Sequence, residues 1–255
     1  MLIGMMNNPR KDVVEEAYWA AEHGFDFLDL TIEGPAADLA QIDVVALKQV
    51  LDEANMQVTG HTAWFLPFAS PVERVRRAAV EEVAAALPTF AELDVKFVNV
   101  HIVRGVSSFG YASMLQLNGK SFAELAELAE PYGIRIMVEH PPEPDLHTDD
   151  IRKILNADAR LGFHLDVGHA HIGRDSLEAL LKAFKQRLCH VHVSDNRGRS
   201  DDHMPLGAGN IDWPRTIHLL KKSGYDGMIT LEVFAEDRDL LLHSAAKFRE
   251  WWDAS

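Results

Sequence analysis

The sequence Gly-Phe-His-Leu-Asp-Val-Gly-His, at residues 162–169, is a short apolar run that ends in a carboxylate and an imidazole. A second such run, Cys-His-Val-His-Val-Ser-Asp, follows at residues 189–195. A glycine-rich stretch, Asp-Asp-His-Met-Pro-Leu-Gly-Ala-Gly-Asn-Ile-Asp, completes the region at residues 201–212. Apolar and polar residues alternate with a period of two in both runs, which predicts two strands whose polar side chains share one face.

The rest of the chain repeats this pattern, with segments of helical periodicity between the runs. Eight strands are predicted, at Leu2–Met6, Phe25–Ile32, Gln57–Thr62, Lys96–Ile102, Arg135–His140, Leu161–Val167, Leu188–Ser194 and Met228–Phe234. Eight helices are predicted, at Asp12–His23, Asp43–Asn55, Pro71–Leu93, Ser121–Tyr132, Asp149–Asn156, Ser176–Arg187, Trp213–Ser223 and Asp237–Trp252.

Strict alternation of strand and helix indicates the α/β class, with parallel strands joined by right-handed crossovers. Eight such units in 255 residues are what a closed (β/α)8 TIM barrel needs. An open doubly wound sheet is the alternative, but the Gly-x-Gly-x-x-Gly turn expected after its first strand is missing. Since no linker or repeat divides the chain, we predict a single TIM-barrel domain over residues 1–255.

Composition narrows the possible partners. The net charge of -14 argues against nucleic acid and anionic membranes, which bind clustered Lys and Arg. The single cysteine, Cys189, allows no intrachain disulfide and fits a reducing compartment. We expect no signal peptide and no membrane-spanning segment, and therefore a cytoplasmic protein. Exposed helix faces often pair in such barrels, so a homo-oligomer is compatible with the sequence.

Six of the predicted strands end in a residue that can bind a metal. These residues are His61, His101, Glu139, Asp166, His192 and Glu232. Function in a TIM barrel gathers at the carboxyl ends of the strands, and the alternating apolar neighbours must face the helices. The six polar side chains are therefore expected to point into the barrel mouth.

A bound divalent cation explains why six strands end alike. Buried carboxylates and imidazoles crowded into one pocket are costly unless a cation compensates their charge and lone pairs. Taken singly, a strand-end His is more often a hydrogen-bonded core residue, Glu139 or Glu232 could pair with an Arg, and Asp166 could cap a helix. Their joint occurrence favours the metal. His164 and His190 lie one layer deeper and are expected to orient ligands through hydrogen bonds.

On these residues the chain resembles the xylose isomerase-like barrel superfamily, which joins sugar (phosphate) isomerases and epimerases to endonuclease IV. The most specific motifs are Val-Glu-His at 138–140, Asp-Val-Gly-His at 166–169, His-Val-Ser-Asp at 192–195, the stretch 201–212 already quoted, and Leu-Glu-Val at 231–233. The likeness extends from His61 to Glu232 and so spans most of the chain.

The resemblance to the epimerase branch implies a single divalent metal (Mn, Mg, Co or Zn) held by Glu139, Asp166, His192 and Glu232. It also implies that Glu139 and Glu232 form the acid/base pair and that His169 contacts a substrate oxygen. His61 and His101 are further candidates for substrate contact. An Arg shortly after the seventh strand often touches the substrate in this branch, and Arg197 and Arg199 straddle that spacing, so Arg197 is a candidate.

Endonuclease IV is similar in another respect, because it holds three zinc ions with nine ligands. Matching residue types occur here at His61, His101, Glu139, Asp166, His169, His192, Asp201, His203 and Glu232. Ligand type alone therefore does not separate the two branches. The charge of -14 and the lack of basic loops argue against the nuclease.

The leading hypothesis is a metal-dependent isomerase or epimerase of a sugar or sugar phosphate. A divalent metal acts as a Lewis acid that polarises the sugar carbonyl and stabilises the enediolate formed on proton removal. One of Glu139 and Glu232 removes the proton from carbon, and either carboxylate returns it. Trp64, Phe65 and Phe109 are expected in loops above the mouth, where they either exclude water or only cover the barrel top.

Overall fold

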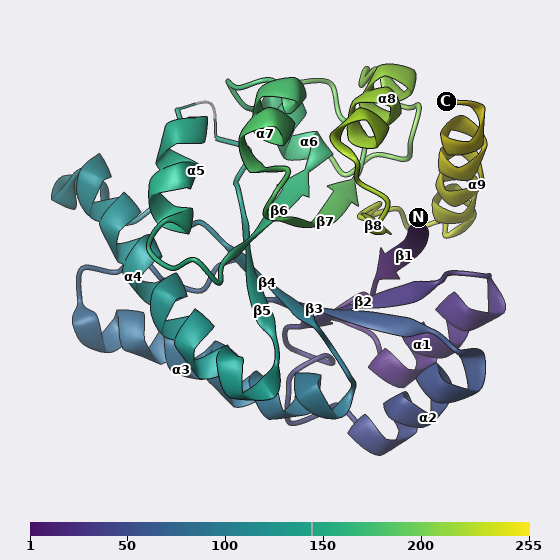
Figure 1. Ribbon diagram of the computed structural model, residues 1–255. Coiled ribbons are helices and arrows are strands. Elements are labelled where there is room, and N and C mark those ends of the chain that lie inside the picture. The colour runs from purple at the N-terminus through teal and green to yellow at the C-terminus, as the bar shows by residue number, and fades with distance from the viewer. Residues whose placement is uncertain (144) are drawn as a thin grey trace.

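A computed structural model describes residues 1–143 and 145–255. Eight parallel strands form a closed barrel in chain order (Figure 1), and β1 pairs with both β2 and β8. The strands are β1 Leu2–Met6, β2 Phe27–Ile32, β3 Gln57–Thr62, β4 Phe97–His101, β5 Arg135–Glu139, β6 Gly162–Asp166, β7 Leu188–Val193 and β8 Met228–Leu231. The predicted fold class is thereby confirmed.

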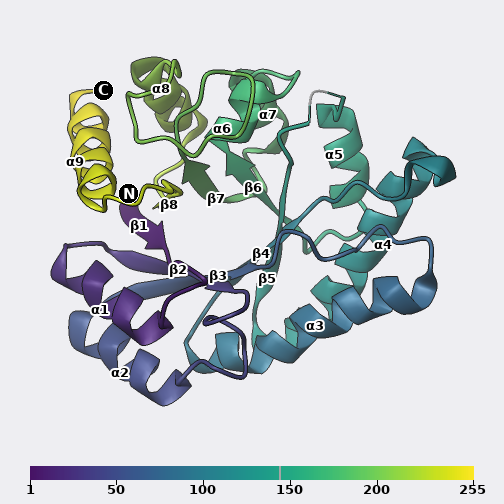
Figure 2. The same ribbon diagram turned by 180° about the vertical axis from the view of Figure 1, so that it is seen from behind.

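Helices surround the barrel, as the two opposite views of Figures 1 and 2 show. They are α1 Val13–Glu22, α2 Val44–Ala54, α3 Glu73–Glu92, α4 Tyr111–Ala129, α5 Thr148–Leu155, α6 Val167–Ile172, α7 Leu177–Phe184, α8 Trp213–Ser223 and α9 Asp239–Ala254, with 3-10 turns η1 Ser107–Phe109 and η2 Glu130–Tyr132. Among the described residues, no helix combines the length and apolar character needed to cross a membrane.

The fourth helix differs from the prediction, because α4 begins at Tyr111 rather than at Ser121. Asn118 and Gly119 discourage a helix on propensity alone, but both are buried in tertiary contacts. The amide of Asn118 donates to the carbonyl of Val103 and accepts from its N–H. Gly119 lets α4 approach α5, since a Cβ there would lie 3.2 Å from Ala157 Cβ. Tertiary packing therefore extends this helix beyond what its sequence suggests.

A second difference is α6, a helix of one and a half turns that directly follows β6 and was not predicted. Asp166 caps it, because the Asp166 carboxylate accepts a hydrogen bond of 2.6 Å from the backbone N–H of His169. The helix-capping alternative considered for Asp166 is thus present in the structure. It uses Oδ1 of Asp166 and leaves Oδ2 directed into the barrel.

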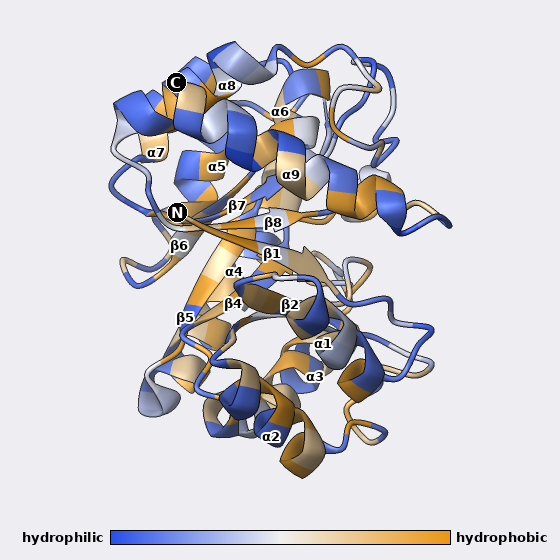
Figure 3. Ribbon diagram, turned by 90° about the vertical axis from the view of Figure 1, so that its right-hand side faces the viewer, coloured by the Kyte–Doolittle hydropathy of each residue, from blue (hydrophilic) through white to orange (hydrophobic). Residues whose placement is uncertain are grey.

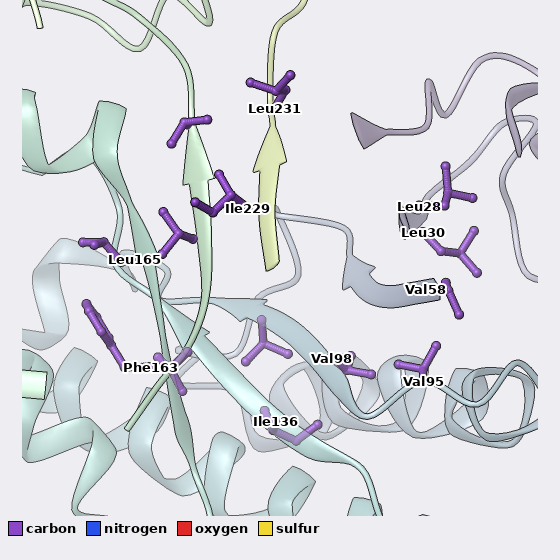
Figure 4. Close-up of a cluster of buried hydrophobic side chains, with 14 of the residues drawn as sticks. Leu28, Leu30, Val58, Val95, Val98, Ile136, Phe163, Leu165, Ile229 and Leu231 are labelled. Atoms are coloured by element: carbon purple, nitrogen blue, oxygen red, sulfur yellow. The ribbon is translucent and has the colours of Figure 1, made fainter. Parts of the chain in front are cut away.

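The apolar core lies between the barrel and its helices. Figure 4 shows outward-facing strand residues of this layer, among them Leu28, Val98, Ile136, Phe163 and Ile229. The colouring in Figure 3 places hydrophobic residues in the strands and hydrophilic ones at many outer helix positions. Burial of this apolar surface stabilises the barrel, and it fixes the direction of the alternate side chains, which must point inward.

The inside of the barrel is polar for much of its depth. The inward positions below the strand ends carry buried Asp29, Thr59, Asn99, His164, His190 and Thr230. The strands align these residues in layers, since His164 is in register with Glu139 and His190, and Thr230 is in register with His192. The residues at the mouth therefore rest on a network of hydrogen-bonding groups instead of a hydrocarbon floor.

Candidate metal centre and active site

The four residues predicted as metal ligands converge at the carboxyl ends of β5 to β8. Side-chain ligand atoms of Glu139, Asp166 and His192 all lie within 4.8 Å of one another. Nδ1 of His192 lies 3.0 Å from a carboxylate oxygen of Glu232 and 4.0 Å from Oδ2 of Asp166. Glu232 follows β8 directly, and all four side chains are buried. This donor set, one imidazole and three carboxylates, suits a divalent cation.

Asp166 provides the clearest sign that a cation fits here. Its side chain is fully buried, and its Oδ2 has no hydrogen-bond partner among the described residues. Burial is the main cause that raises the pKa of Asp166 to about 7, and neighbouring carboxylates add to this effect. A buried, unpartnered carboxylate oxygen is unfavourable. A cation between these groups would supply the partner that Asp166 lacks.

A second group of ligand types forms around Glu139, at the ends of β3 and β4. Nε2 of His101 lies 3.0 Å from Glu139 Oε2, and ligand atoms of His61, His101 and Glu139 lie within 4.8 Å of one another. Burial and the nearby His101 lower the pKa of His61 to about 4, so its imidazole is neutral at pH 7. A neutral imidazole has a lone pair available for a metal or a substrate hydroxyl.

A third group joins His169, Asp201 and His203. Nε2 of His169 lies 2.9 Å from Asp201 Oδ2, and Nε2 of His203 lies 3.1 Å from the same oxygen. The Nδ1–H of His169 donates to the carbonyl oxygen of His140 at 2.8 Å, which fixes the ring orientation. Although burial opposes it, Asp201 raises the pKa of His203 to about 9. The structure thus brings all nine residues with predicted ligand types into three adjoining groups.

Asp29, on β2, is part of the site although it was not among the residues predicted from the sequence. Nε2–H of His192 donates to its Oδ2 at 2.7 Å, and Thr230 Oγ1–H donates to the same oxygen at 2.8 Å. Burial alone would raise the pKa of Asp29, but hydrogen bonds from His190 and His192 outweigh it and hold the pKa well below its usual range. The sequence did contain one signal for Asp29, because this carboxylate interrupts the apolar residues Phe27, Leu28 and Leu30 of a predicted strand.

The two deeper histidines take different roles from those expected. Nε2 of His190 lies 2.8 Å from Thr230 Oγ1 and 3.5 Å from Asp29, so His190 supports Asp29 and contacts no predicted ligand through a hydrogen bond. The ring of His164 packs edge-on against His192, with centroids 4.1 Å apart. Neither ring nitrogen of His164 has a hydrogen-bond partner among the described residues. His164 therefore positions His192 by packing.

The loop that carries Asp201 and His203 folds around another buried carboxylate, Asp195. It accepts hydrogen bonds from the backbone N–H groups of Asn196, Gly207 and Ile211, at 2.9, 2.8 and 3.3 Å, and from the Trp213 indole at 2.9 Å. A Cβ at position 209 would lie 2.2 Å from Asp195 Oδ1, so only glycine fits there. Asp195 therefore determines where the loop presents the third group.

Above these groups lies a cavity of about 1010 Å³. Its lining includes Glu139, Glu232 and five of the other predicted site residues, His61, His101, His169, Asp201 and His203. Trp64 and Phe65 line it too, whereas Phe109 does not appear among its described lining residues. Arg197 is exposed and is also absent from the described lining of this cavity. The arginines among the described lining residues are Arg10 and Arg104. The structure thus does not bring Arg197 to the predicted substrate position.

The sequence matches the family described as xylose isomerase-like TIM barrel over residues 17–252. A protein of Methanocaldococcus jannaschii, described as uncharacterized, is 31% identical over 225 residues, which are 83% of this chain and 76% of that protein. An inosose isomerase of Bacillus licheniformis is 27% identical over 64% of this chain and 62% of its own length. The chain belongs to the xylose isomerase-like TIM barrel family.

Solved structures agree with this assignment. A D-tagatose 3-epimerase-like protein superposes with a TM-score of 0.88 and 26% identity, covering 100% of this chain and 98% of that one. The IolI protein, solved with a bound zinc atom, superposes with a TM-score of 0.82 over 100% and 99% of the two chains, but at 18% identity it supports the fold alone. These relatives include an inosose isomerase and a D-tagatose 3-epimerase-like protein, in agreement with the isomerase and epimerase likeness of the sequence motifs.

Proposed function

We propose that this protein is a metal-dependent sugar isomerase or epimerase. The observation that carries the proposal is the arrangement of Glu139 and Glu232. They enter the mouth from β5 and β8, and Asp166 and His192 approach between them from β6 and β7. Two carboxylates that flank a shared centre can remove a proton on one side of a substrate and return one on the other.

The residues fit a divalent cation held by Glu139, Asp166, His192 and Glu232. When bound, such a cation polarises a sugar carbonyl and makes the adjacent C–H more acidic. Asp29 keeps Nδ1 of His192 directed at the centre by accepting the proton of Nε2. His101, followed by His164 and His169, lowers the pKa of Glu139 despite its burial, so the carboxylate is in the ionised form that a base requires.

The remaining side chains of the mouth suit substrate binding. His61 and His101 line the cavity on the side of β3 and β4, and His169 lines it beside Asp201. Both ring nitrogens of His61 and Nδ1 of His101 have no hydrogen-bond partner among the described residues and can exchange a hydrogen bond with a sugar hydroxyl. A substrate oxygen at His169 would have to compete with Asp201 for Nε2. Trp64 and Phe65 line the cavity and would limit the access of water if a bound substrate packed against them. Similarity to an inosose isomerase and to a D-tagatose 3-epimerase-like protein supports this assignment.

Solvent exchange tests the proposal. The metal-loaded protein is incubated in D2O with ketoses and their phosphates, and deuterium at carbon is followed by NMR. An active sugar should gain deuterium with the wild type and lose that exchange with Glu139→Gln or Glu232→Gln. Glu250→Gln, an exposed position on α9, is the matched control and should exchange normally. Full activity in either site variant would refute the mechanism.

A phosphodiesterase acting on abasic DNA is the second candidate. The observation that favours it is the convergence of all nine ligand types in three groups, which also matches the pattern of endonuclease IV. The net charge of -14 disfavours binding to a DNA backbone. Metal analysis separates the two candidates, since about three zinc ions per chain favour the nuclease and one divalent ion the isomerase. Incision of an abasic duplex would decide for the nuclease.

A further inference from the structure

The loop after β7 is one of the two places where TIM barrels commonly bind a substrate phosphate, through free backbone N–H groups. In this chain those groups point at an internal carboxylate. Asn196, Gly207 and Ile211 all donate their N–H groups to Asp195, and Gly198 donates to the side chain of Asn196. Because Asp195 already occupies the anion position of the loop, these donors are not available to a phosphate.

The second common phosphate position, at the loop after β8 and the start of α9, is closed in a similar way. The Asp237 carboxylate accepts from the N–H of Asp239 at 3.0 Å, and Phe234 donates its N–H to the carbonyl of His203 at 3.1 Å. Arg238 pairs with Glu16 and lies 3.9 Å from the Trp19 ring centroid, so its charge is already compensated. Arg238 therefore offers a phosphate little free charge at this end of the mouth.

The arginines that line the cavity do not replace those positions. Arg104 bonds to the carboxylates of both Glu143 and Asp145, so its charge is already compensated. Arg10 is exposed at the rim, and the described residues give its side chain no carboxylate partner. A single exposed guanidinium holds an anion weakly, because water and salt screen it. Glu33, which also lines the cavity, would repel a phosphate.

The cavity wall is instead suited to the C–H faces of a sugar. Trp64 and Phe65 form a T-shaped pair with ring centroids 5.8 Å apart, and 64% and 56% of their surfaces remain exposed. Phe234, 60% exposed, lies against His203 with centroids 4.4 Å apart. Exposed aromatic rings that flank a polar centre give an uncharged ligand apolar contact area, and the polar centre fixes its hydroxyls.

From these observations we infer that the site takes an unphosphorylated sugar and discriminates against the corresponding phosphate ester. This inference depends on the proposed isomerase or epimerase function and specifies its substrate class. Neutral ketoses and cyclic keto-polyols belong to the class, since both present a carbonyl with neighbouring hydroxyls and carry no charge. Phosphate esters of the same sugars do not.

Matched pairs of substrates test this inference with the metal-loaded wild-type protein. Deuterium incorporation from D2O is measured for L-ribulose and L-ribulose 5-phosphate, for D-tagatose and D-tagatose 6-phosphate, and for a cyclic inosose. We expect kcat/KM to favour the unphosphorylated partner by at least about tenfold. Equal or better use of a phosphate ester would overturn the inference and leave the proposed function standing. Exchange into none of these sugars would overturn both.

A pair of variants tests whether the compensated charge of Arg104 causes the discrimination against phosphate esters. The double variant Glu143→Gln with Asp145→Asn releases Arg104, and the kcat/KM of the phosphate ester relative to its neutral partner should rise at least about threefold. Glu81→Gln removes an exposed carboxylate on α3, remote from the mouth, and should leave that ratio at the wild-type value. The same ratio in the double variant and the wild type would contradict the charge-based discrimination.

Discussion

The carboxylate of Asp29 lies 2.7 Å from Nε2 of His192, although 163 positions separate these residues in the chain. Asp29 belongs to β2 and His192 to β7, and closure of the barrel brings their inward side chains together. The hydrogen bond leaves Nδ1 of His192 facing Asp166 and Glu232. A carboxylate behind a metal-binding histidine fixes the ring and increases its basicity, so Asp29 positions the centre without touching it.

Replacing Asp29 by Asn is expected to weaken metal binding by about 10- to 100-fold, because an amide accepts the proton of His192 less strongly than a carboxylate. Titration of metal-free protein with Zn or Mn measures the change. Asp26→Asn is the matched control, since Asp26 bonds to the backbone of Ile3 and to Arg249, away from the mouth. Circular dichroism checks that both variants fold. Wild-type affinity in Asp29→Asn would show that the hydrogen bond does not support the centre.

Metal binding should also stabilise the fold. A divalent ion that binds only the folded state adds about 2.7 kcal/mol at a free concentration of about 100 times its Kd. For a chain of this size, that corresponds to a rise in Tm of roughly 5–10 °C. Thermal unfolding of chelator-treated protein, with and without added metal, gives the shift. Asp166→Asn keeps a side chain able to cap α6 but loses a charged ligand, so an equal shift in this variant would contradict the assigned site.

The affinity for metal should rise with pH between about 6 and 8. Burial, together with nearby carboxylates, raises the pKa of Asp166 to about 7, so the metal-free protein holds a proton there at pH 6. A cation must displace that proton, and the competition from Asp166 weakens as pH rises through its pKa. Calorimetry in two buffers of different ionisation enthalpy measures the released proton. If Asp166→Asn released as many protons as the wild type when it binds metal at pH 6, the released proton would belong to another group.

Asp195→Asn is expected to destabilise the protein by at least about 3 kcal/mol, because several buried N–H donors lose their charged acceptor. Urea unfolding measures the loss, and metal content reports whether the group at Asp201 and His203 remains in place. Asp202→Asn is the control in the same loop, since Asp202 is exposed and, among the described residues, accepts a side-chain hydrogen bond from Ser200 alone. A difference of less than about 1 kcal/mol between the two variants would mean that Asp195 does not organise the loop.

The sequence alone was sufficient to predict the barrel and the strands whose polar ends meet at its mouth. Strand and helix periodicities differ, so their alternation identified eight units, and the period of two within the strands placed Glu139, Asp166 and His192 on the inward face. Local pattern did not predict the start of α4 at Tyr111 or the helix α6, because packing against α5 and the cap by Asp166 decide them.

The tertiary structure decided which residues meet. Asp29 reaches His192 only because the barrel closes, and Asp195 gathers its donors only because the loop after β7 folds back on it. Arg197 matched a sequence spacing, but it is exposed and lies outside the cavity. Arg10 and Arg104 line the cavity instead. A pattern of period two determines the face on which a side chain lies, whereas distances between strands and the paths of loops depend on contacts between residues far apart in the chain.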